Sequence, residues 1–326
     1  MNRARGLLAA LAAAALLAGC TAGSDATNAA KTGKYTQPPL PANAITIRTD
    51  SPIPPERDEP CGDATASLRP TGAGAGAHGP TIDAIRARGR LVVGLDTGSN
   101  LFSFRDPVSG SIVGFDADIA REVARDLLGS PEQIEYRSLG SAERESALQS
   151  HSVDMVAKTM TINCERRQRV SFSTVYLHAN QRVLAMKNSG IRGLIDLAGK
   201  RVCTVSGTTS LDNIRRGQPA ATILTVPTWA DCLVVLQQRQ VDAVSTDDAV
   251  LAGLAAQDPS YTELVGPSIS VEPYGIGIPK GNDDLIRFVN GTLERIRNDG
   301  TWVRLYQQYL IALGPVPAPP VPTYQD

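Results

Sequence analysis

The sequence predicts an α/β protein of two lobes connected by extended crossover strands, and three observations support this fold class. The chain has 326 residues, more than one hydrophobic core usually organises. Strand-like and helix-like segments alternate in two successive series, as in parallel sheets that helices cover on both faces. Between the series lies QRVLAMK (181–187), which we expect to form one of the extended connections.

The first series starts with the strand-like segment RLVVGLD (90–96) and continues with IVGF (112–115). The next segment, DADIAREVARDLLG (116–129), is amphipathic, because its apolar residues recur at helical spacing and a glycine ends it. A strand, a helix and a strand then follow, with the sequences QIEYRS (133–138), SAERESALQS (141–150) and VDMVA (153–157). This order predicts the first parallel sheet.

The second series starts with the predicted strand RVCTV (201–205) and helix LDNIRR (211–216). The strands TILTV and VDAVS and the helices WADCLVVLQQRQ and DDAVLAGLAAQ complete it. Two further helices, within 284–313, are expected to pack on the first lobe. We therefore place the first lobe at 81–185 and 275–313, and the second lobe at 186–274.

Composition excludes some classes of protein. Charged residues make up 20% of the chain and hydrophobic residues 42%, as in ordinary globular domains. The formal net charge is -1, so we expect no strong electrostatic attraction to nucleic acid and no nucleic-acid partner.

The first twenty residues, MNRARGLLAALAAAALLAGC, have the pattern of an export signal. Two arginines precede a short Ala/Leu run, and small residues stand directly before Cys20. This arrangement resembles the bacterial lipobox, so residues 1–19 are expected to be a signal peptide and Cys20 a lipidated N-terminus. The alternative is a plain signal peptide with an incidental cysteine. Lipidation would anchor the exported protein on the outer face of the cell membrane.

Two segments outside the lobes have compositions that bury little apolar surface. Residues 20–80 are rich in Thr, Ala, Gly and Pro, and include TGAGAGAHGP. We expect a flexible, lipid-anchored extension there, with Cys61 pinning its later part to the body. The Pro-rich tail at 314–326 is expected to be extended.

Four cysteines remain after Cys20. An even count in an exported protein favours disulfides over metal ligation. The spacing matches no zinc motif and the three histidines are scattered, so we expect neither a metal site nor a cofactor. The residues are Cys61, Cys164, Cys203 and Cys232, and His78, His151 and His178.

Several stretches occur in the order seen in one family. They are RLVVGLD, FSFRDPVSGSIVGFDADIAREVARDL, MTINCERRQRVSFS, VCTVSGTTS, VDAVSTDDAVL and PYGIGIPKGN. Over about residues 82 to 312 the chain resembles the polar amino acid-binding proteins of ABC importers. The resemblance implies a type II periplasmic-binding fold, in which two Rossmann-like lobes close around one ligand at the carboxyl ends of their strands.

The resemblance also implies which residues hold the ligand's α-carboxylate. Arg166 ends a T-x-x-x-x-R pattern that starts at Thr161, and a guanidinium matches a carboxylate with two parallel hydrogen bonds. The alternative is a turn of solvated arginines, which we accept for Arg167 and Arg169. From the second lobe, Thr208 and Thr209 are expected to contact the same carboxylate, or else to cap the following helix.

The ligand's ammonium group requires an anion. The resemblance assigns it to Asp247, with Asp248 capping the helix, although Asp247 could itself be the cap. Asp96, at the end of the first strand, is a second acidic candidate. Some acidic amino acid binders carry a basic residue near this position, so Asp96 argues against a pocket identical to theirs. Thr159 is also placed among the ligand contacts.

Two residues are expected to read the ligand's side chain. Arg144 falls where glutamate/aspartate binders resembling this chain carry an arginine that binds the side-chain carboxylate. The alternative is a surface arginine paired with Glu143 or Glu145. Trp229 is either a pocket residue or an anchor of the core.

The lobes also set the expected disulfides. Cys203 lies in a strand of the second lobe and Cys232 in a helix expected to cover that sheet, so they can pair. Cys164, in the first lobe, then requires Cys61, since a bridge between lobes would resist their opening.

The predicted function is a monomeric, exported receptor for aspartate or glutamate, then asparagine or glutamine. It would deliver this ligand to an ABC permease or, alternatively, report it to a membrane sensor. A dehydratase-type enzyme on the same fold is the less favoured alternative, because it needs a general acid in the cleft and no histidine stands beside the expected clamp.

Overall fold

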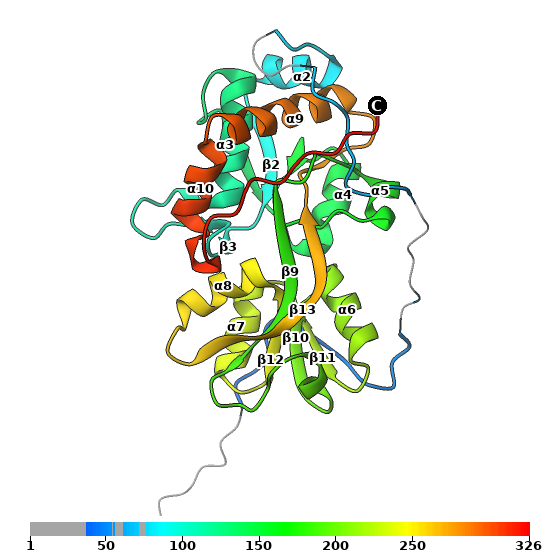
Figure 1. Ribbon diagram of the computed structural model, residues 1–326, viewed down its shortest axis with the longest axis vertical. Helices are drawn as coiled ribbons and strands as arrows, with labels where there is room; N and C mark the ends of the chain where they lie inside the picture. The colour runs from blue at the N-terminus through cyan, green and yellow to red at the C-terminus, as the bar shows by residue number, and fades with distance from the viewer. Residues whose placement is uncertain (1–36, 54, 56–60, 72–75) are drawn as a thin grey trace, which may run out of the picture. The chain divides into compact units, whose positions relative to one another are not determined.

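A computed structural model describes residues 37–53, 55, 61–71 and 76–326 (Figure 1). Residues 39–326 form one compact unit, to which the following description applies. The expected signal peptide and Cys20 lie outside the described residues. Within the described part of the chain, no helix has the length and apolar character needed to cross a membrane.

The first lobe is built on a five-stranded sheet. Its inner strand β2 pairs in parallel with both β6 and β7, while β14 runs antiparallel to β7 and β8. The strand order is β6 (Ile134–Ser138), β2 (Leu91–Leu95), β7 (Met155–Val156), β14 (Gly277–Ile278) and β8 (Ser171–Phe172). A small separate sheet contains β3 (Gly98–Ser99), β4 (Ser103–Arg105) and β5 (Ile112–Val113).

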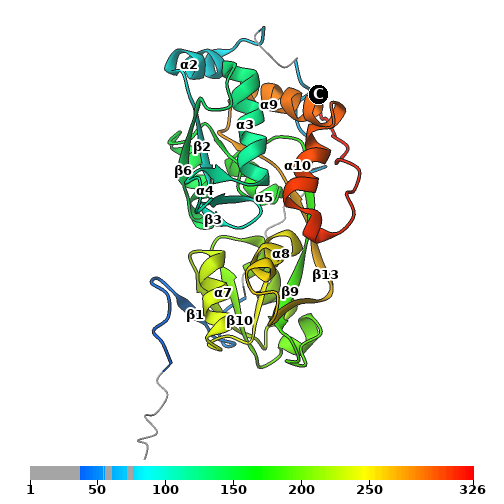
Figure 2. The same ribbon diagram turned by 90° about the vertical axis from the view of Figure 1, so that its left-hand side faces the viewer.

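Helices cover this sheet and complete its core. α3 and α9 pack together, and α10 packs on both, as Figure 2 shows. The long helices are α2 (Pro80–Arg88), α3 (Phe115–Leu128), α9 (Asp283–Asn298) and α10 (Thr301–Tyr309), and the short ones near the cleft are η1 (Ser141–Glu143), α4 (Arg144–Gln149) and α5 (Cys164–Arg169). Buried aromatic rings, among them Phe115, Tyr176 and Trp302, join these helices in one apolar cluster. The two last helices therefore return to the first lobe, as expected.

The second lobe is built on a six-stranded sheet. The order is β1 (Ile45–Ile47), β11 (Thr222–Val226), β10 (Arg201–Val205), β12 (Ala243–Asp247), β9 (Leu177–Met186) and β13 (Thr262–Tyr274). The helices of this lobe are α6 (Thr209–Gly217), α7 (Trp229–Gln237) and α8 (Asp248–Gln257). Two further short helices are of the 3₁₀ type, η2 (Leu194–Leu197) and, after α10, η3 (Ile311–Leu313). The long antiparallel strands β9 and β13 run between the two lobes (Figure 1). The predicted α/β fold with two crossover strands is confirmed.

The crossover strands enter the second sheet earlier than the sequence suggested. β9 pairs with β12 from Gln181 to Ala185, which lie in the predicted range of the first lobe. An extended segment between two lobes satisfies its backbone groups by pairing with whichever sheet it runs beside. The sheet of the second lobe therefore begins before residue 186, the predicted start of that lobe.

The expected flexibility of residues 20–80 is wrong for two parts of that interval. β1 forms an edge strand, with Ile45 opposite Thr225 of β11. Farther along, Ser67 forms a bridge with Tyr324 of the C-terminal tail, and the Arg69 N–H donates to Asp326 at 2.8 Å. Both parts find backbone or charged partners far away in sequence, which composition does not reveal. The tail likewise packs on the body.

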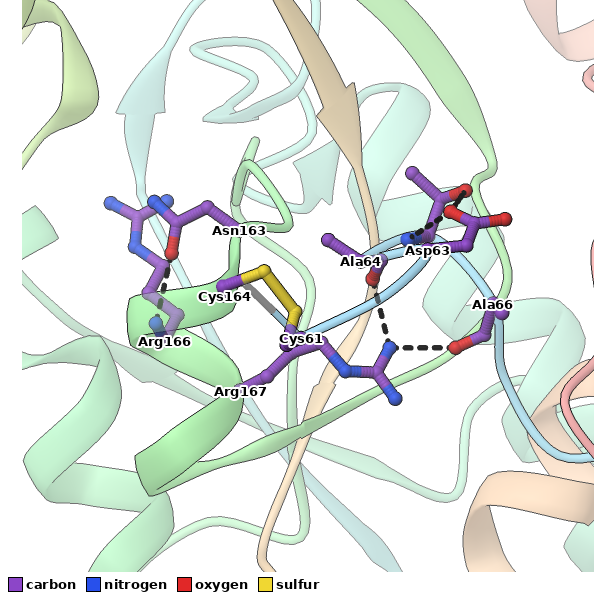
Figure 3. Close-up of a disulfide and its surroundings, with 9 residues drawn as sticks. Cys61, Asp63, Ala64, Ala66, Asn163, Cys164, Arg166 and Arg167 are labelled. Carbon is purple, nitrogen blue, oxygen red and sulfur yellow. Dashed lines mark hydrogen bonds between the residues drawn. A yellow bond between two sulfur atoms is a disulfide. The ribbon is translucent and has the colours of Figure 1, made fainter. Parts of the chain in front are cut away.

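Both disulfides form with the expected pairing. Cys61 bonds to Cys164 at the start of α5, and Cys203 bonds to Cys232 within the second lobe. Beside the first bond, the Arg167 guanidinium donates to the carbonyls of Ala64 and Ala66 at 2.8 and 2.6 Å (Figure 3). The expectation of a solvated Arg167 is therefore wrong, because this side chain satisfies carbonyls of the N-terminal extension.

Breaking the Cys61–Cys164 bond should destabilise the protein. The bond closes a sequence separation of 103 residues, for which chain entropy predicts about 5 kcal/mol of stabilisation. Cys61→Ala, Cys164→Ala and the double variant should lose the same free energy of unfolding in denaturant titrations, because any of them removes the one bond. A double variant that loses the sum of the two single effects, or free thiols at these positions in the wild type, would contradict the pairing.

Candidate ligand-binding site

An enclosed pocket lies between the lobes at the ends of strands and the starts of helices. Side chains from both lobes line it: Ser141, Arg144, Thr159, Thr161, Arg166, Thr208, Thr209, Ser210, Trp229, Thr246, Asp247 and Val250. Every residue expected to bind the ligand is among them except Asp96. The free volume is about 10 Å³, room for about one water molecule. Groups in the wall must therefore move before an amino acid can enter.

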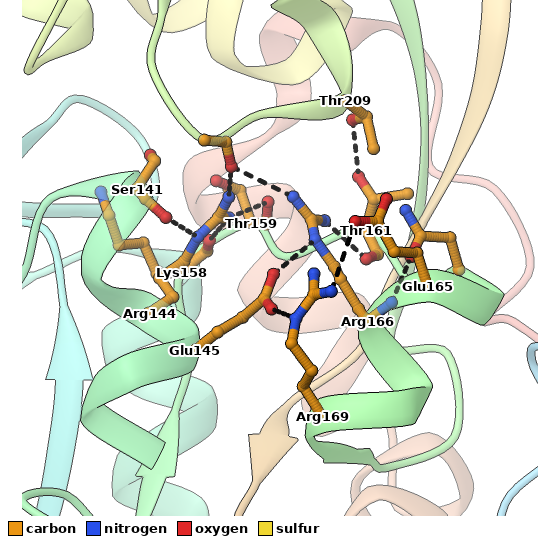
Figure 4. Close-up of polar contacts among 12 residues, drawn as sticks. Ser141, Arg144, Glu145, Lys158, Thr159, Thr161, Glu165, Arg166, Arg169 and Thr209 are labelled. Carbon is orange, nitrogen blue, oxygen red and sulfur yellow. Dashed lines mark hydrogen bonds and ion pairs between the residues drawn. The ribbon is translucent and has the colours of Figure 1, made fainter. Parts of the chain in front are cut away.

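Arg166 is buried in the pocket wall on α5. Asn163 caps this helix by accepting the Arg166 backbone N–H at 2.8 Å. The guanidinium donates to the carbonyls of Thr161 at 2.7 Å and Gly207 at 3.3 Å, and its Nε lies 3.5 Å from a carboxylate oxygen of Glu145 (Figure 4). The alternative of a solvated turn is wrong, since residues 164–169 are helical and Arg166 is covered.

Arg169 was expected to be solvated and is instead ion-paired. It binds Glu145, and it lies 3.3 Å from Glu165 one turn earlier on the helix. Both carboxylates raise its pKa, chiefly through the hydrogen bond that Arg169 donates to Glu145. Because Glu145 accepts from Arg169 and lies beside Arg166, it holds α5 against α4.

Arg144 is buried and binds backbone carbonyls. It donates to Ser141 at 2.9 Å, to Lys158 at 3.0 Å and to Gly207 at 3.1 Å. Its pKa falls to about 9, because burial and then the neighbouring Arg166 disfavour its charge. The alternative of a surface ion pair with Glu143 or Glu145 is wrong, because the side chain points into the pocket.

Asp247 lines the pocket, and one of its carboxylate oxygens has no hydrogen-bond partner among the described residues. Its Oδ2 accepts from the Tyr274 hydroxyl, while Oδ1 is buried and has no hydrogen-bond partner among the described residues. Burial, and then the charge of Glu272, raise the pKa of Asp247 to about 8. Its side chain makes no capping bond. The neighbouring Asp248 accepts the backbone N–H groups of Asn180 and Ala249, at 3.1 and 2.8 Å.

The two threonines of the second lobe have different roles. Thr208 caps α6, because its hydroxyl accepts the Leu211 N–H at 3.3 Å and donates to the Val205 carbonyl at 2.7 Å. Thr209 instead donates to the carboxylate of Glu272 at 2.7 Å. The capping alternative is thus correct for the Thr208 hydroxyl.

Thr159 has a strained backbone at the pocket wall. Its φ is 39°, a left-handed conformation that β-branched residues rarely adopt. Its N–H donates to the buried Asp116 at 2.9 Å, and Tyr176 donates its hydroxyl to the same carboxylate at 2.7 Å. Burial raises the pKa of Asp116 to about 6. This network holds the Thr159 carbonyl where it also accepts from Arg144, at 3.2 Å.

Trp229 and Asp96 complete the expected set. Trp229 lines the pocket and also packs in the apolar cluster of the second lobe, so it serves both expected purposes. Asp96 lies outside this pocket, where Lys158 Nζ binds its carboxylate at 2.6 Å. It lines a neighbouring cavity of about 580 Å³ that shares Ser141 with the pocket.

Sequence reasoning missed Lys158 and Glu272. Lys158 is buried and adjoins Thr159, and its pKa is lowered by burial, which the charge of Asp96 opposes. Glu272 is a buried carboxylate within β13, directly before the motif PYGIGIPKGN. The available signal was a single acidic residue in the otherwise uncharged stretch 264–279. Among the described residues, no group of three or more His, Cys, Asp or Glu side chains could hold a metal ion.

Comparisons with known proteins identify the family. Residues 91–312 match the bacterial extracellular solute-binding proteins, family 3. The ABC transporter glutamine-binding protein GlnH of Bacillus subtilis is 36% identical, over 71% of this chain and 84% of the relative. The glutamate-binding protein GluB of Corynebacterium glutamicum is 31% identical, over 76% of this chain and 87% of the relative.

Solved structures agree with this assignment. An ancestral arginine-binding protein bound to glutamine has a TM-score of 0.64 and 34% identity, and the match covers 68% of this chain and 98% of that one. The ancestral amino acid-binding protein AncCDT-1, a precursor of cyclohexadienyl dehydratase, has a TM-score of 0.65 and 33% identity over 71% and 99% of the two chains. The chain therefore belongs to family 3 of the bacterial extracellular solute-binding proteins.

Proposed function

We propose that this protein captures a polar amino acid outside the cell membrane, aspartate or glutamate before asparagine or glutamine, and delivers it unchanged to an ABC permease. The observation that carries this proposal is the charge of the pocket wall. Two guanidinium groups, Arg144 and Arg166, and one carboxylate, Asp247, line it. An acidic amino acid has the complementary set, with two carboxylates and one ammonium group.

Each charged wall residue has a matching partner on such a ligand. Arg166 receives the α-carboxylate, because a guanidinium binds a carboxylate through parallel charge-assisted bonds. Asp247 receives the ammonium group at its unpartnered Oδ1. Arg144 receives the side-chain carboxylate or amide oxygen. This assignment leaves no charged group of the ligand without a buried partner, as binding in a closed site requires.

The Gly207 carbonyl supports this placement. It accepts from Arg144 and from Arg166, at 3.1 and 3.3 Å, and so brings the second lobe against both guanidinium groups. A ligand carboxylate is a stronger acceptor than a backbone carbonyl and would displace it. A ligand bound to groups on both lobes favours the closed arrangement, which a permease can distinguish from the open one.

The relatives support the proposed ligand class and output. Those named above bind glutamine or glutamate by name, and the first belongs to an ABC transporter. We also propose export, anchoring through a lipid on Cys20 and a monomeric receptor. A membrane sensor that reads the closed lobes is the second candidate partner. An enzymatic reaction is disfavoured, because both relatives carry the names of binding proteins; recovery of the amino acid unchanged after incubation tests this.

Arg144→Ala should change the ligand preference. Aspartate and glutamate should bind about 10- to 100-fold more weakly, since each loses a charge-assisted hydrogen bond, while glutamine should lose only a few-fold. Calorimetric titration of both proteins with glutamate and glutamine measures this ratio, and glutamine serves as the matched control for folding. An equal loss for the two ligands, or none, would remove Arg144 from the side-chain site.

A further inference from the structure

Glu272 is a buried carboxylate that joins both lobes behind the pocket. It lies on the crossover strand β13, and its Oε2 accepts the hydroxyl of Thr161 from the first lobe at 2.7 Å. The same oxygen accepts the hydroxyl of Thr209 from the second lobe at 2.7 Å. Thr161 and Thr209 line the pocket, whereas Glu272 does not, so its hydrogen bonds reach a ligand only through these hydroxyl groups.

The other oxygen of Glu272 is held from behind. Oε1 accepts from the Ser270 hydroxyl at 2.5 Å and from the Asn213 side-chain amide at 3.2 Å. The same nitrogen of Asn213 also donates to Gln181 at 2.8 Å, which fixes the direction of this amide. Glu272 is therefore an acceptor on two sides, with its orientation set by neighbours outside the pocket.

This arrangement decides what the two threonines can offer a ligand. A threonine hydroxyl has one proton to donate and two lone pairs to accept with. Thr161 and Thr209 both give their proton to Glu272, so only lone pairs remain for the pocket. Lone pairs attract an ammonium group and repel a carboxylate. The expected contact of Thr209 with the ligand's α-carboxylate is therefore at odds with the direction of its hydroxyl hydrogen bond.

We propose that Glu272 is a positioning residue that directs Thr161 and Thr209 to accept from the ligand's α-ammonium group, on the same side of the site as Asp247. The inference rests on the proposed function, because it assumes an amino acid ligand. Under this proposal the pocket wall has two sides. Asp247 and the two threonine hydroxyls accept hydrogen bonds on one side, and the guanidinium groups of Arg144 and Arg166 donate them on the other. Glu272 thereby makes the site selective for amino acids over acids that lack the α-amino group.

Glu272→Gln tests the inference with a nearly isosteric side chain. A glutamine accepts on only one side. Because Asn213 can only donate at this contact, the new amide nitrogen should face the threonines and turn their protons into the pocket. At a pH above the pKa of Asp247, where this carboxylate is ionised in both proteins, L-glutamate should then bind about 10- to 100-fold more weakly. Glutarate is glutamate without the α-amino group. Its affinity for the Glu272→Gln variant, measured by competition with L-glutamate, should stay within a few-fold of its affinity for the wild type.

The pH profile supplies a readout that a purely structural role would not change. Ammonium binding requires ionised Asp247, whose pKa is raised by burial first and then by Glu272. The other charged or titratable groups near it are Tyr274 on β13, Asp248 on α8, Arg144 on α4 and Arg166 on α5. Removing the charge of Glu272 should lower this pKa, so the pH at which glutamate affinity stops rising should shift down.

Thr209→Val provides the second variant. It removes one of the hydroxyl groups that Glu272 directs, so combining it with Glu272→Gln should cost less than the sum of the two losses. An equal loss for glutamate and glutarate with an unchanged pH profile would overturn the inference, and so would additive losses in the double variant. A wild-type protein that binds no amino acid would instead overturn the proposed function. If the wild type selects L-glutamine, glutaramate replaces glutarate.

Discussion

Replacing Arg166 with alanine should abolish tight binding of every amino acid alike. All of them carry the α-carboxylate that this guanidinium is proposed to hold in a buried site. Truncating one partner of a buried, hydrogen-bonded charge pair costs about 2–5 kcal/mol, equivalent to a loss of about 30- to 5000-fold in affinity. Calorimetry with glutamate, aspartate and glutamine should show losses of similar size for all three.

Arg169→Ala is the matched control for this variant. Arg169 lies on the same short helix and binds the same Glu145, but it does not line the pocket. It should bind all three amino acids with nearly wild-type affinity. Near-normal affinity in Arg166→Ala, or an equal loss in Arg169→Ala, would show that the helix rather than the Arg166 guanidinium matters.

Asp247→Asn should weaken all amino acids by a comparable amount and remove the pH dependence of binding. The pKa of Asp247 is about 8, raised above its usual value chiefly by burial. Below pH 8 the Asp247 carboxyl of the ligand-free protein is therefore mostly protonated. An ammonium group binds the ionised form, and binding therefore releases a proton. Wild-type affinity should rise about tenfold per pH unit as pH increases toward 8, and then level off.

Calorimetry in two buffers with different ionisation enthalpies measures the released proton. The wild type should release close to one proton at pH 6, whereas Asp247→Asn should release almost none. Asp248→Asn is the control, because that side chain binds backbone N–H groups outside the pocket. Pronounced pH dependence that persists in Asp247→Asn would assign the titration to another group.

The elements of the fold follow from local patterns that the sequence displays directly. The amphipathic segment before Gly129 forms α3, and that glycine ends it in a left-handed conformation with a φ of 85°. The strands of the second series appear at β10, β11 and β12 because each short apolar run is bounded by helix-starting residues. Periodicity and caps depend on neighbouring residues only, so one sequence is enough to find them.

Pairings between distant segments could not be predicted in the same way. The edge strand β1 depends on an open side of β11, almost 180 residues away in the chain. Arg167 depends on carbonyls of the extension, and Glu272 depends on hydroxyls from both lobes. The resemblance named the threonines, but only the direction of their hydrogen bonds shows which charge of a ligand they suit.

A thermal-shift screen of the purified protein against the twenty amino acids tests the central claim most directly. A ligand that binds only the native state raises the melting temperature in proportion to the logarithm of its concentration over its Kd. The charge of the pocket wall predicts the largest increases for aspartate and glutamate, smaller ones for asparagine and glutamine, and none for lysine or arginine. No increase with any amino acid, or the largest increase with a basic one, would contradict the proposed receptor.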